Sequence, residues 1–265
     1  MAKIIDSVRL YMHYVSLNVR SAMQYKASLL LMTMGQLLIS FSTFFGIHFM
    51  FMRFSNVRGY TYPQVLLCFA IVLLQFSLAE MFARGFDMFA GIVRRGEFDR
   101  VLVRPRSTIL QVLGAKFEIT RIGRMAQAVI IFIYAVRSSD VVWTPLRVGT
   151  LVLMLAGGML LFAGLFLVYA ALCFYTLEGL EFMNVLTDGG REYGKYPVDV
   201  YGKRLLQFST FIVPYALVQY YPLQVLLGRS ERVLDALCPL SAVPFLLICY
   251  GVWRIGVSRY TSSGS

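Results

Sequence analysis

Residues 148–177 are VGTLVLMLAGGMLLFAGLFLVYAALCFYTL, a stretch without a single charged side chain. An α-helix rises about 1.5 Å per residue, so about 20 residues cross the roughly 30 Å hydrocarbon layer of a bilayer. The stretch is therefore long enough to span a membrane, with length left over for tilt or for an interfacial turn. It predicts a membrane protein built from apolar helices.

The composition of all 265 residues agrees with this prediction. The chain is 58% hydrophobic and only 15% charged, with a mean hydropathy of +0.67. A soluble domain carries about 25% charged residues. A larger soluble core does not explain the difference, because the apolar residues form unbroken blocks instead of alternating or helical stripes. The expected fold class is an all-α membrane protein with one transmembrane domain over residues 1–265.

Other runs without formal charge locate further spans, at 27–52, 59–79, 205–228 and 236–253. With the first run, they predict membrane helices at about 27–52, 61–83, 148–177, 205–221 and 238–256. A sixth span at about 114–136 is less obvious, because Lys116, Glu118, Arg121 and Arg124 crowd one end. Glu118 and Arg121 can pair three residues apart, and arginine stems can reach the headgroups. The alternative is an interfacial helix that never crosses.

The distribution of basic residues favours six spans. Both termini and two long loops then share one side, which holds 19 of the 25 lysines and arginines, against six on the other side. An excess of basic residues marks the cytoplasmic face. Without the span at 114–136, the basic residues from Arg191 to Arg204 would move outside and the bias would be lost. We therefore expect a bacterial plasma (inner) membrane protein with both termini in the cytoplasm.

The segment before the first span has the pattern of an amphipathic helix. Ile4, Val8, Tyr11 and Val15 fall on one helical stripe, and basic residues such as Arg9 lie opposite. Such a helix suits the inner interface, where anionic membrane lipid is the expected partner. The formal charge of +11 is accordingly assigned to lipid contact and orientation, and no nucleic-acid partner is expected. A solvated leader with accidental spacing is the alternative for 1–26.

Two expected cytoplasmic loops contain ordered features. In the first, Gly96 predicts a helix stop and Pro105 blocks further helix, while apolar residues between them, such as Phe98 and Val103, give a small surface ringed by charge. That surface suits docking of a soluble partner, or packing on the chain's own helices. The second loop, 178–204, is nearly neutral and contains the turn sequence Asp188–Gly189–Gly190.

Prolines interrupt the run 205–228. A helix that is kinked at Pro214, ends near Tyr220–Tyr221–Pro222 and is followed by a short re-entrant piece would explain both Pro214 and Pro222. Simple kinks without re-entry are the alternative.

Residues for catalysis are missing from the sequence. It contains no GxxxxGK[ST] phosphate loop, no HExxH and no GxSxG, and His13 and His48 are its only histidines. No carboxylate is expected at a span centre, and Glu80 is expected to pair with Arg84 at the inner boundary. We therefore expect no catalytic residue, cofactor site or metal site in this chain.

Four stretches carry a resemblance to a known family. They are GEFDRVLVRP (96–105), EGLEFMNVLTDGGREYGKYPVDVY (178–201), FIVPYALVQYYPLQVLLGR (211–229) and SRYTSSGS (258–265). Together they resemble a six-span, single-domain branch of the type-2 ABC (ATP-binding cassette) permeases, along essentially the full chain.

The resemblance implies a function and partners. It implies a permease subunit of an ATP-driven exporter that moves an amphipathic drug-, lipid- or glycan-like substrate. It implies two copies of a separate cytoplasmic ABC ATPase, which would hold ATP and Mg, and a second six-span permease, related or identical. The ATPase-docking residues would be Gly96, Glu97, Phe98, Asp99, Arg100, Arg104 and Pro105, and the kink or re-entrant residues Pro214, Tyr220, Tyr221 and Pro222. The alternatives are a membrane-embedded enzyme acting on lipid and a scaffold subunit that transports nothing.

Overall fold

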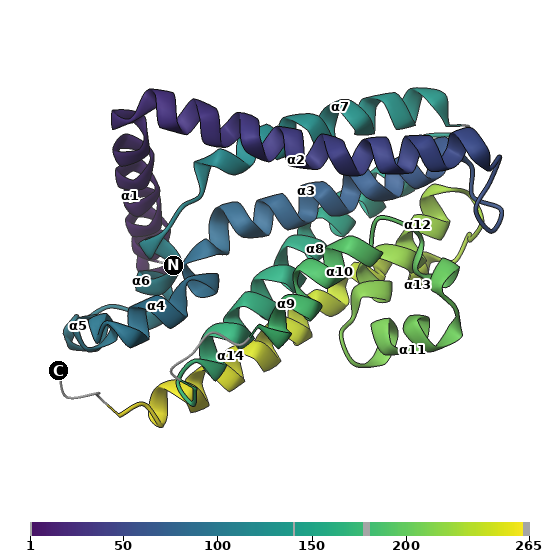
Figure 1. The fold of residues 1–265 in the computed structure, drawn as a ribbon. Helices are drawn as coiled ribbons and strands as arrows, with labels where there is room; N and C mark the ends of the chain where they lie inside the picture. Colours follow the sequence, from purple (N-terminus) through teal and green to yellow (C-terminus); the bar gives the residue numbers. More distant parts are fainter. Residues whose placement is uncertain (1, 140, 177–180, 262–265) are drawn as a thin grey trace.

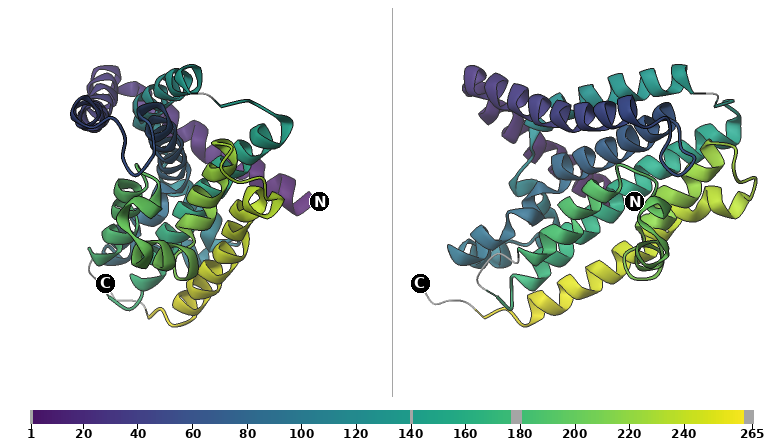
Figure 2. Two further views of the ribbon diagram at one scale, coloured as in Figure 1. Left: turned by 90° about the vertical axis from the view of Figure 1, so that its right-hand side faces the viewer. Right: turned by 45° about the vertical axis from the view of Figure 1, so that its right-hand side comes forward.

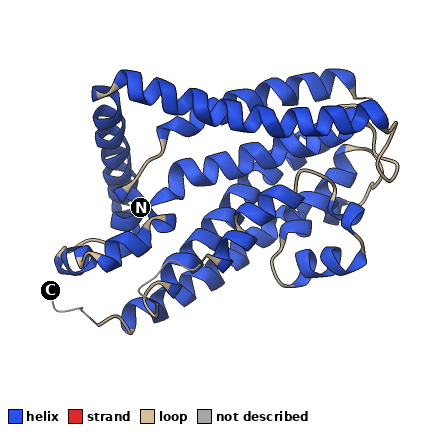
Figure 3. Cartoon of the chain, viewed as in Figure 1, coloured by secondary structure: helices blue, strands red, loops and turns tan. Residues whose placement is uncertain are grey.

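The computed structural model describes residues 2–139, 141–176 and 181–261, and this part of the chain is almost entirely helical (Figure 3). It contains no β-strand beyond one isolated bridge between Val57 and Tyr60. Its long helices are α1 (Ala2–Gln24), α2 (Lys26–Arg53), α3 (Tyr62–Asp87), α7 (Ile122–Ser138), α8 (Pro145–Leu172) and α14 (Ala242–Ser258). The predicted all-α membrane fold is confirmed.

Five helical stretches of the described chain are long and apolar enough to cross a membrane. They are Lys26–Arg53, Tyr62–Arg94, Ile119–Ser138, Pro145–Leu172 and Val233–Ser258. Helix α3 forms the centre of the bundle and packs against α7 on one side and α8 on the other (Figures 1 and 2). Helix α2 packs on α7, and α14 packs on α8. The core therefore follows α3, whereas α2 buries only Ser40 and Ile47.

Helix α1 lies across one end of the bundle, at a steep angle to α2 (Figure 1). The Tyr11 hydroxyl donates to the carbonyl oxygen of Phe82 at 3.0 Å, and the Asn18 amide donates to that of Gly114 at 3.2 Å. The predicted amphipathic helix at 1–26 is thus present and fastened to the bundle end, and its contact with lipid stays a prediction.

The start of the predicted span at 114–136 is wrong by a few residues. Helix α6 (Thr108–Ala115) ends before the crossing helix begins, and residues 116–118 between them are not helical. The backbone N–H of Glu118 there donates to the Met81 carbonyl at 3.2 Å, which satisfies a donor that a helix would otherwise use. The crossing helix begins with a single turn at Ile119–Arg121 (η1) and continues as α7.

The predicted span at 205–221 is also wrong. Helix α11 (Lys203–Phe211) has only nine residues, and the chain then breaks around Pro214. A π-helical turn, η3 (Ala216–Tyr220), leads into α12 (Tyr221–Leu226). Pro214 therefore ends a helix instead of kinking one, and Pro222 sits in the first turn of α12, where its missing N–H costs least.

The segment that was expected to be a cytoplasmic loop runs along the bundle instead. It comprises α9 (Phe182–Leu186), α10 (Asp188–Tyr193) and η2 (Val198–Tyr201). The Arg191 guanidinium lies 4.8 Å from the Phe76 ring centre, the Cys68 thiol donates to the Gly194 carbonyl at 3.3 Å, and the Tyr60 hydroxyl donates to the Asp199 carboxylate at 3.0 Å. These contacts progress toward the N-terminus of α3, so the segment runs antiparallel to it.

Asp199 consequently lies with the loop between α2 and α3. The Arg58 guanidinium of that loop donates to the Asp199 carbonyl at 2.9 Å. Arg58 and Asp199 were expected on opposite sides of the membrane, so the expected separation of the Arg58 loop from the loop 178–204 is wrong. Its first residues and the end of the expected span 148–177 fall on 177–180, which lie outside the described residues.

After α12, the chain turns back through α13 (Val233–Leu237) and η4 (Cys238–Ser241) into α14. Helix α8 lies close to this turn, since a Cβ on Gly157 would be 2.7 Å from the Pro239 carbonyl oxygen. A glycine is therefore required for this close approach of the two backbones.

Candidate functional site

The predicted docking loop forms a compact projection, here called the knob, made of residues 89–105. Helix α4 (Phe89–Arg94) extends the line of α3, and α5 (Glu97–Val103) turns back from it. Gly96 between them has φ = +63°, a left-handed conformation that favours glycine. The knob lies at the same end of the bundle as α1 and the last described residues of the chain (Figure 1).

Phe98 holds the knob to the bundle. Its side chain is fully buried, and its ring centre lies 5.3 Å from that of Phe89, 5.0 Å from Phe174 and 5.0 Å from Tyr260. Trp253 of α14, also buried, is 6.2 Å away. Rings at these separations and near-perpendicular angles attract one another beyond the area that they bury. Phe98 is thus an internal anchor, and the prediction that it is part of an exposed apolar surface is wrong.

The exposed part of the knob is its outer end. Val103 is 82% exposed and Leu102 43% exposed. The side chains of Arg100, Arg104 and Pro105 are also exposed, whereas Asp99 is partly buried and the Glu97 side chain is 39% exposed. The remaining predicted docking residues therefore divide into an exposed apolar and basic tip and a supporting base.

Two acidic residues at the base of the knob have fixed partners. The Glu97 carboxylate accepts a hydrogen bond from Arg95 at 2.8 Å, and this bond lowers the pKa of Glu97. The Asp99 carboxylate lies near the Tyr260 hydroxyl; burial, followed by this carboxylate, raises the pKa of Tyr260. Both acids thus have neighbours within the chain and are less available to a partner than the tip is.

Helices α6 and α1 brace the other side of the knob. The Gln111 side-chain amide donates to the carbonyl oxygens of Val101 and Arg106 at 3.0 and 3.1 Å. Arg106 in turn pairs with Asp6 of α1 at 2.7 Å. A load on the knob is therefore shared with α1 as well as with α3 and α14.

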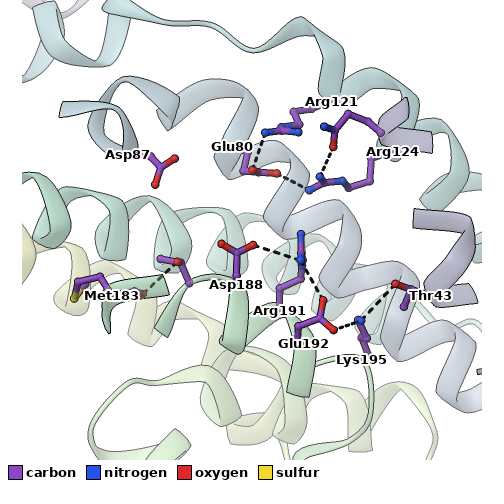
Figure 4. A network of polar contacts seen from close by, with 12 residues as sticks. Thr43, Glu80, Asp87, Arg121, Arg124, Met183, Asp188, Arg191, Glu192 and Lys195 are labelled. Carbon is purple, nitrogen blue, oxygen red and sulfur yellow. Dashed lines mark hydrogen bonds and ion pairs between the residues drawn. The ribbon is translucent and has the colours of Figure 1, made fainter. Parts of the chain in front are cut away.

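A buried ion network lies further along α3. Glu80 pairs with Arg121 at 3.0 Å and with Arg124 at 2.5 Å (Figure 4), and it also pairs with Arg84 at 3.4 Å. The side chains of Glu80, Arg121 and Arg124 are all less than a tenth exposed. The predicted pairing of Glu80 with Arg84 is confirmed. The sequence did not reveal that two further arginines of η1 and α7 share this carboxylate.

A second ionic chain follows α10. Arg191 pairs with Asp188 at 3.3 Å and with Glu192 at 3.1 Å, and Lys195 pairs with Glu192. The Lys195 ammonium also donates to the Thr43 hydroxyl of α2 at 3.5 Å. Figure 4 shows this chain beside the Glu80 network. The expectation that no carboxylate lies at a span centre, with Glu80 at the inner boundary, stays a prediction.

Three of the predicted kink residues, Tyr220, Tyr221 and Pro222, lie at or just before α12, at the opposite end of the bundle from the knob (Figure 1). The Tyr220 and Tyr221 rings contact each other with centres 5.3 Å apart, and Pro222 is buried. Nearby, the Gln224 amide donates to the Tyr60 hydroxyl at 3.0 Å, and Arg229 donates to the Gly59 carbonyl at 2.6 Å. The knob and these residues are thus two separate places, and any coupling between them must pass through the helices.

No three His, Cys, Asp or Glu side chains among the described residues are arranged to hold a metal ion. The four cysteines are free thiols. The polar clusters of the described chain thus consist of ion pairs and hydrogen bonds between its own residues.

Comparison with known proteins gives one match. The family model described as "ABC-2 family transporter protein" matches residues 37–264. A search of curated proteins and a search of solved structures found no match. The matched region includes all the spanning helices except the first part of α2, together with the knob and both ion networks. The chain therefore belongs to the ABC-2 family of transporter proteins.

Proposed function

We propose that this chain is the membrane-spanning permease subunit of an ATP-driven exporter for an amphipathic drug-, lipid- or glycan-like substrate. Energy would come from two copies of a separate cytoplasmic ABC ATPase, which would hold ATP and Mg, and a second six-span permease, related or identical, would complete the path. Membership of the ABC-2 family supports an ABC ATPase as the partner. Anionic lipid around α1 is part of the same proposal.

The single observation that carries the ATPase contact is the construction of the knob. Its base is fixed by Phe98 and the aromatic rings around it, while Val103 at its tip is 82% exposed. An exposed apolar residue on a rigid support, ringed by arginines, has the make-up of a protein interface. Because the knob continues α3, displacement of its tip is transmitted into the centre of the bundle.

A revised path through the membrane belongs to this proposal. Residues 182–201 replace 205–221 as the fifth crossing, because they run from the knob end of α8 to the Arg58 loop. Residues 203–226 then form a re-entrant segment: α11 enters the membrane from the end that carries Arg58, and η3 with α12 returns to that same end. Tyr215 at their turn supports this path, since its ring lies 5.9 Å from that of Phe162 in the middle of α8. The re-entrant piece thus precedes and includes Pro222 instead of following it.

The test is capture of the ABC ATPase encoded beside this chain, with Val103→Asp as the informative variant. A charge placed at the exposed tip should reduce co-purification about tenfold or more, the size expected for a central interface residue. Val142→Asp is the matched control, since Val142 is 68% exposed at the opposite end of the bundle. Equal capture by both variants would contradict the docking site.

Two outcomes would favour the alternatives. Turnover of lipid by the purified chain alone, without ATP, would indicate an embedded enzyme. Stable assembly with the ATPase but no substrate-stimulated ATP hydrolysis would indicate a scaffold subunit.

A further inference from the structure

A cavity of about 70 Å³ lies between α2, α3, α7 and α10, next to the second ionic chain. It is large enough for a few water molecules or for one small anionic group. Arg124, Arg191 and Lys195 line it, with Glu192 as the single carboxylate among the lining residues. The lining therefore carries an excess of positive charge.

The cavity lies near the middle of the helical bundle. Ser40, which also lines it, comes 14 residues after the first residue of α2 and 13 before the last. At about 1.5 Å per residue, it is about 20 Å from either end of that helix. Ionisable side chains at such a depth are costly, and they mark substrate or ion paths more often than structural sites.

The charged groups of the cavity have partners both inside and outside the lining. Glu192, in the lining, is shared by Arg191 and Lys195, while Asp188 and Glu80, outside it, pair with Arg191 and Arg124. The Ser40 residue is only 5% exposed, and its hydroxyl has no hydrogen-bond partner within the described chain. Three cations that line one cavity, beside a buried hydroxyl without a hydrogen-bond partner in the described chain, suit a guest rich in acceptor oxygens, such as a phosphate or a carboxylate.

The cavity opens sideways between α2 and α10. Ile39 at its edge is 65% exposed and the Glu192 side chain is 51% exposed, whereas Lys195 and Arg124 deeper in are 12% and 7% exposed. Phe69 and Leu73 of α3 supply an apolar wall. A molecule with an apolar chain can therefore approach from the side of the bundle and place its charged end at the bottom.

We propose that this cavity binds the phosphate or carboxylate group of an amphipathic anion through Arg124, Arg191 and Lys195, with the apolar part lying along α2 and α3. Ser40 donates a further hydrogen bond. If the chain is a permease, as proposed above, the transported molecule is an anionic amphiphile. Binding of such a molecule to the cavity does not depend on that function.

The experiment uses the purified full chain in a non-ionic detergent, with bound lipid counted by native mass spectrometry. Dioleoyl phosphatidic acid is the probe, and dioleoylglycerol, which has the same chains without the phosphate, is its comparison. The phosphate should raise retention about tenfold or more, as expected for charge-assisted hydrogen bonds that replace water. Inorganic phosphate at equal concentration should not displace the lipid, because it lacks the apolar part.

Variants separate binding from folding. Lys195→Gln should lower retention of phosphatidic acid about tenfold, and Lys195→Arg should restore most of it. Ser40→Leu changes no charge but fills the cavity, so it should lower retention to a similar extent. Arg137→Gln removes one charge from the exposed end of α7 and should behave as the unmodified chain does.

Several results would overturn the proposal. They are equal retention of phosphatidic acid and dioleoylglycerol, unchanged retention in both Lys195→Gln and Ser40→Leu, and displacement of the lipid by an equal amount of inorganic phosphate. Because no ATPase is present, these outcomes are independent of the capture experiment. Loss of ATPase capture with anion binding intact would remove the permease function and leave the binding site standing.

Discussion

At the scale of single residues, Glu80 has the largest set of charged neighbours described in this chain. Its carboxylate pairs with three arginines. Arg84 is on the same helix, whereas Arg121 belongs to η1 and Arg124 to α7. Buried ion pairs repay their desolvation only when the geometry is close and the remaining donors are satisfied. Gln36 of α2 meets part of that requirement by accepting from Arg124 at 2.5 Å.

Replacing Glu80 with Gln should therefore destabilise the bundle strongly. The substitution leaves buried guanidinium groups without a counter-charge, which costs about 3–5 kcal/mol in the free energy of unfolding. Denaturant unfolding of the purified protein in detergent measures this change. Glu97→Gln is the control, because the exposed Arg95–Glu97 pair should be worth nothing measurable. Comparable losses in both variants would mean that burial of the Glu80 network is unimportant.

The sequence predicted half of this arrangement. Glu80 and Arg84 are four residues apart on one helix, so their pairing follows from helical geometry. Arg121 and Arg124 are about 40 residues further along the chain, and nothing in their local spacing points to Glu80. Phe98 illustrates the same limit, because a local pattern cannot tell an exposed aromatic residue from one whose partners, Phe174 and Tyr260, lie far along the chain.

At the scale of elements, α8 contains two glycines with opposite surroundings. A Cβ on Gly157 would meet the Pro239 carbonyl oxygen at 2.7 Å, whereas a Cβ on Gly149 would have nothing within 4 Å. Both are inside a 28-residue helix. Helix propensity alone favours alanine at both positions, by about 0.5–1 kcal/mol.

Gly157→Ala and Gly149→Ala should consequently change stability in opposite directions. The first forces α8 away from the turn before α14 and should cost about 1–3 kcal/mol, the range for an overpacked contact. The second should be neutral or slightly stabilising. Thermal unfolding of the two variants, followed by circular dichroism in detergent, provides the comparison. Destabilisation by Gly149→Ala alone would show that the contact with Pro239 is wrong.

Charge-free runs located α2, α3, α8 and α14 closely, because these helices carry charge only toward their ends. The same criterion missed residues 182–201, which contain Asp188, Arg191, Glu192 and Lys195. A usable pattern is present there, since Asp188–Arg191 and Glu192–Lys195 are both pairs three residues apart. Such pairs neutralise each other along one helix face, so a count of charges overstates the cost of burying them.

At the scale of the whole molecule, the revised path leaves the orientation unchanged. Arg191 and Lys195 move into the layer, and Lys203 and Arg204 move to the end that carries Arg58. The knob end then holds 15 of the 25 lysines and arginines against eight at the other end, so the knob end is still expected in the cytoplasm. On the proposed path the number of crossings stays at six, with a different fifth one from that predicted from the sequence.

The new path makes Lys203 accessible from outside the cell. With Lys203→Cys, a membrane-impermeant maleimide added to intact cells should label the chain, because Lys203 is exposed just after η2. Ser107→Cys, exposed beside the knob, should be labelled only after the cells are opened. Labelling of Ser107→Cys but not Lys203→Cys in intact cells would reverse the orientation. If neither variant is labelled in intact cells, residues 182–201 do not cross the membrane and the segment is cytoplasmic, as first predicted.

The aromatic anchor around Phe98 has a mechanical consequence. It ties the knob to Trp253 of α14 and Phe174 just after α8, while the knob itself is the continuation of α3. A displacement of the knob would then move α3, α8 and α14 together. Helix α2 buries little of its surface and is not part of this anchor, so it is the helix least bound to the other three. The boundary that such a displacement would widen is the one between α2 and the end of α10. There the Lys195 ammonium donates to the Thr43 hydroxyl at 3.5 Å and the Tyr196 hydroxyl lies 3.7 Å from the Met50 sulfur.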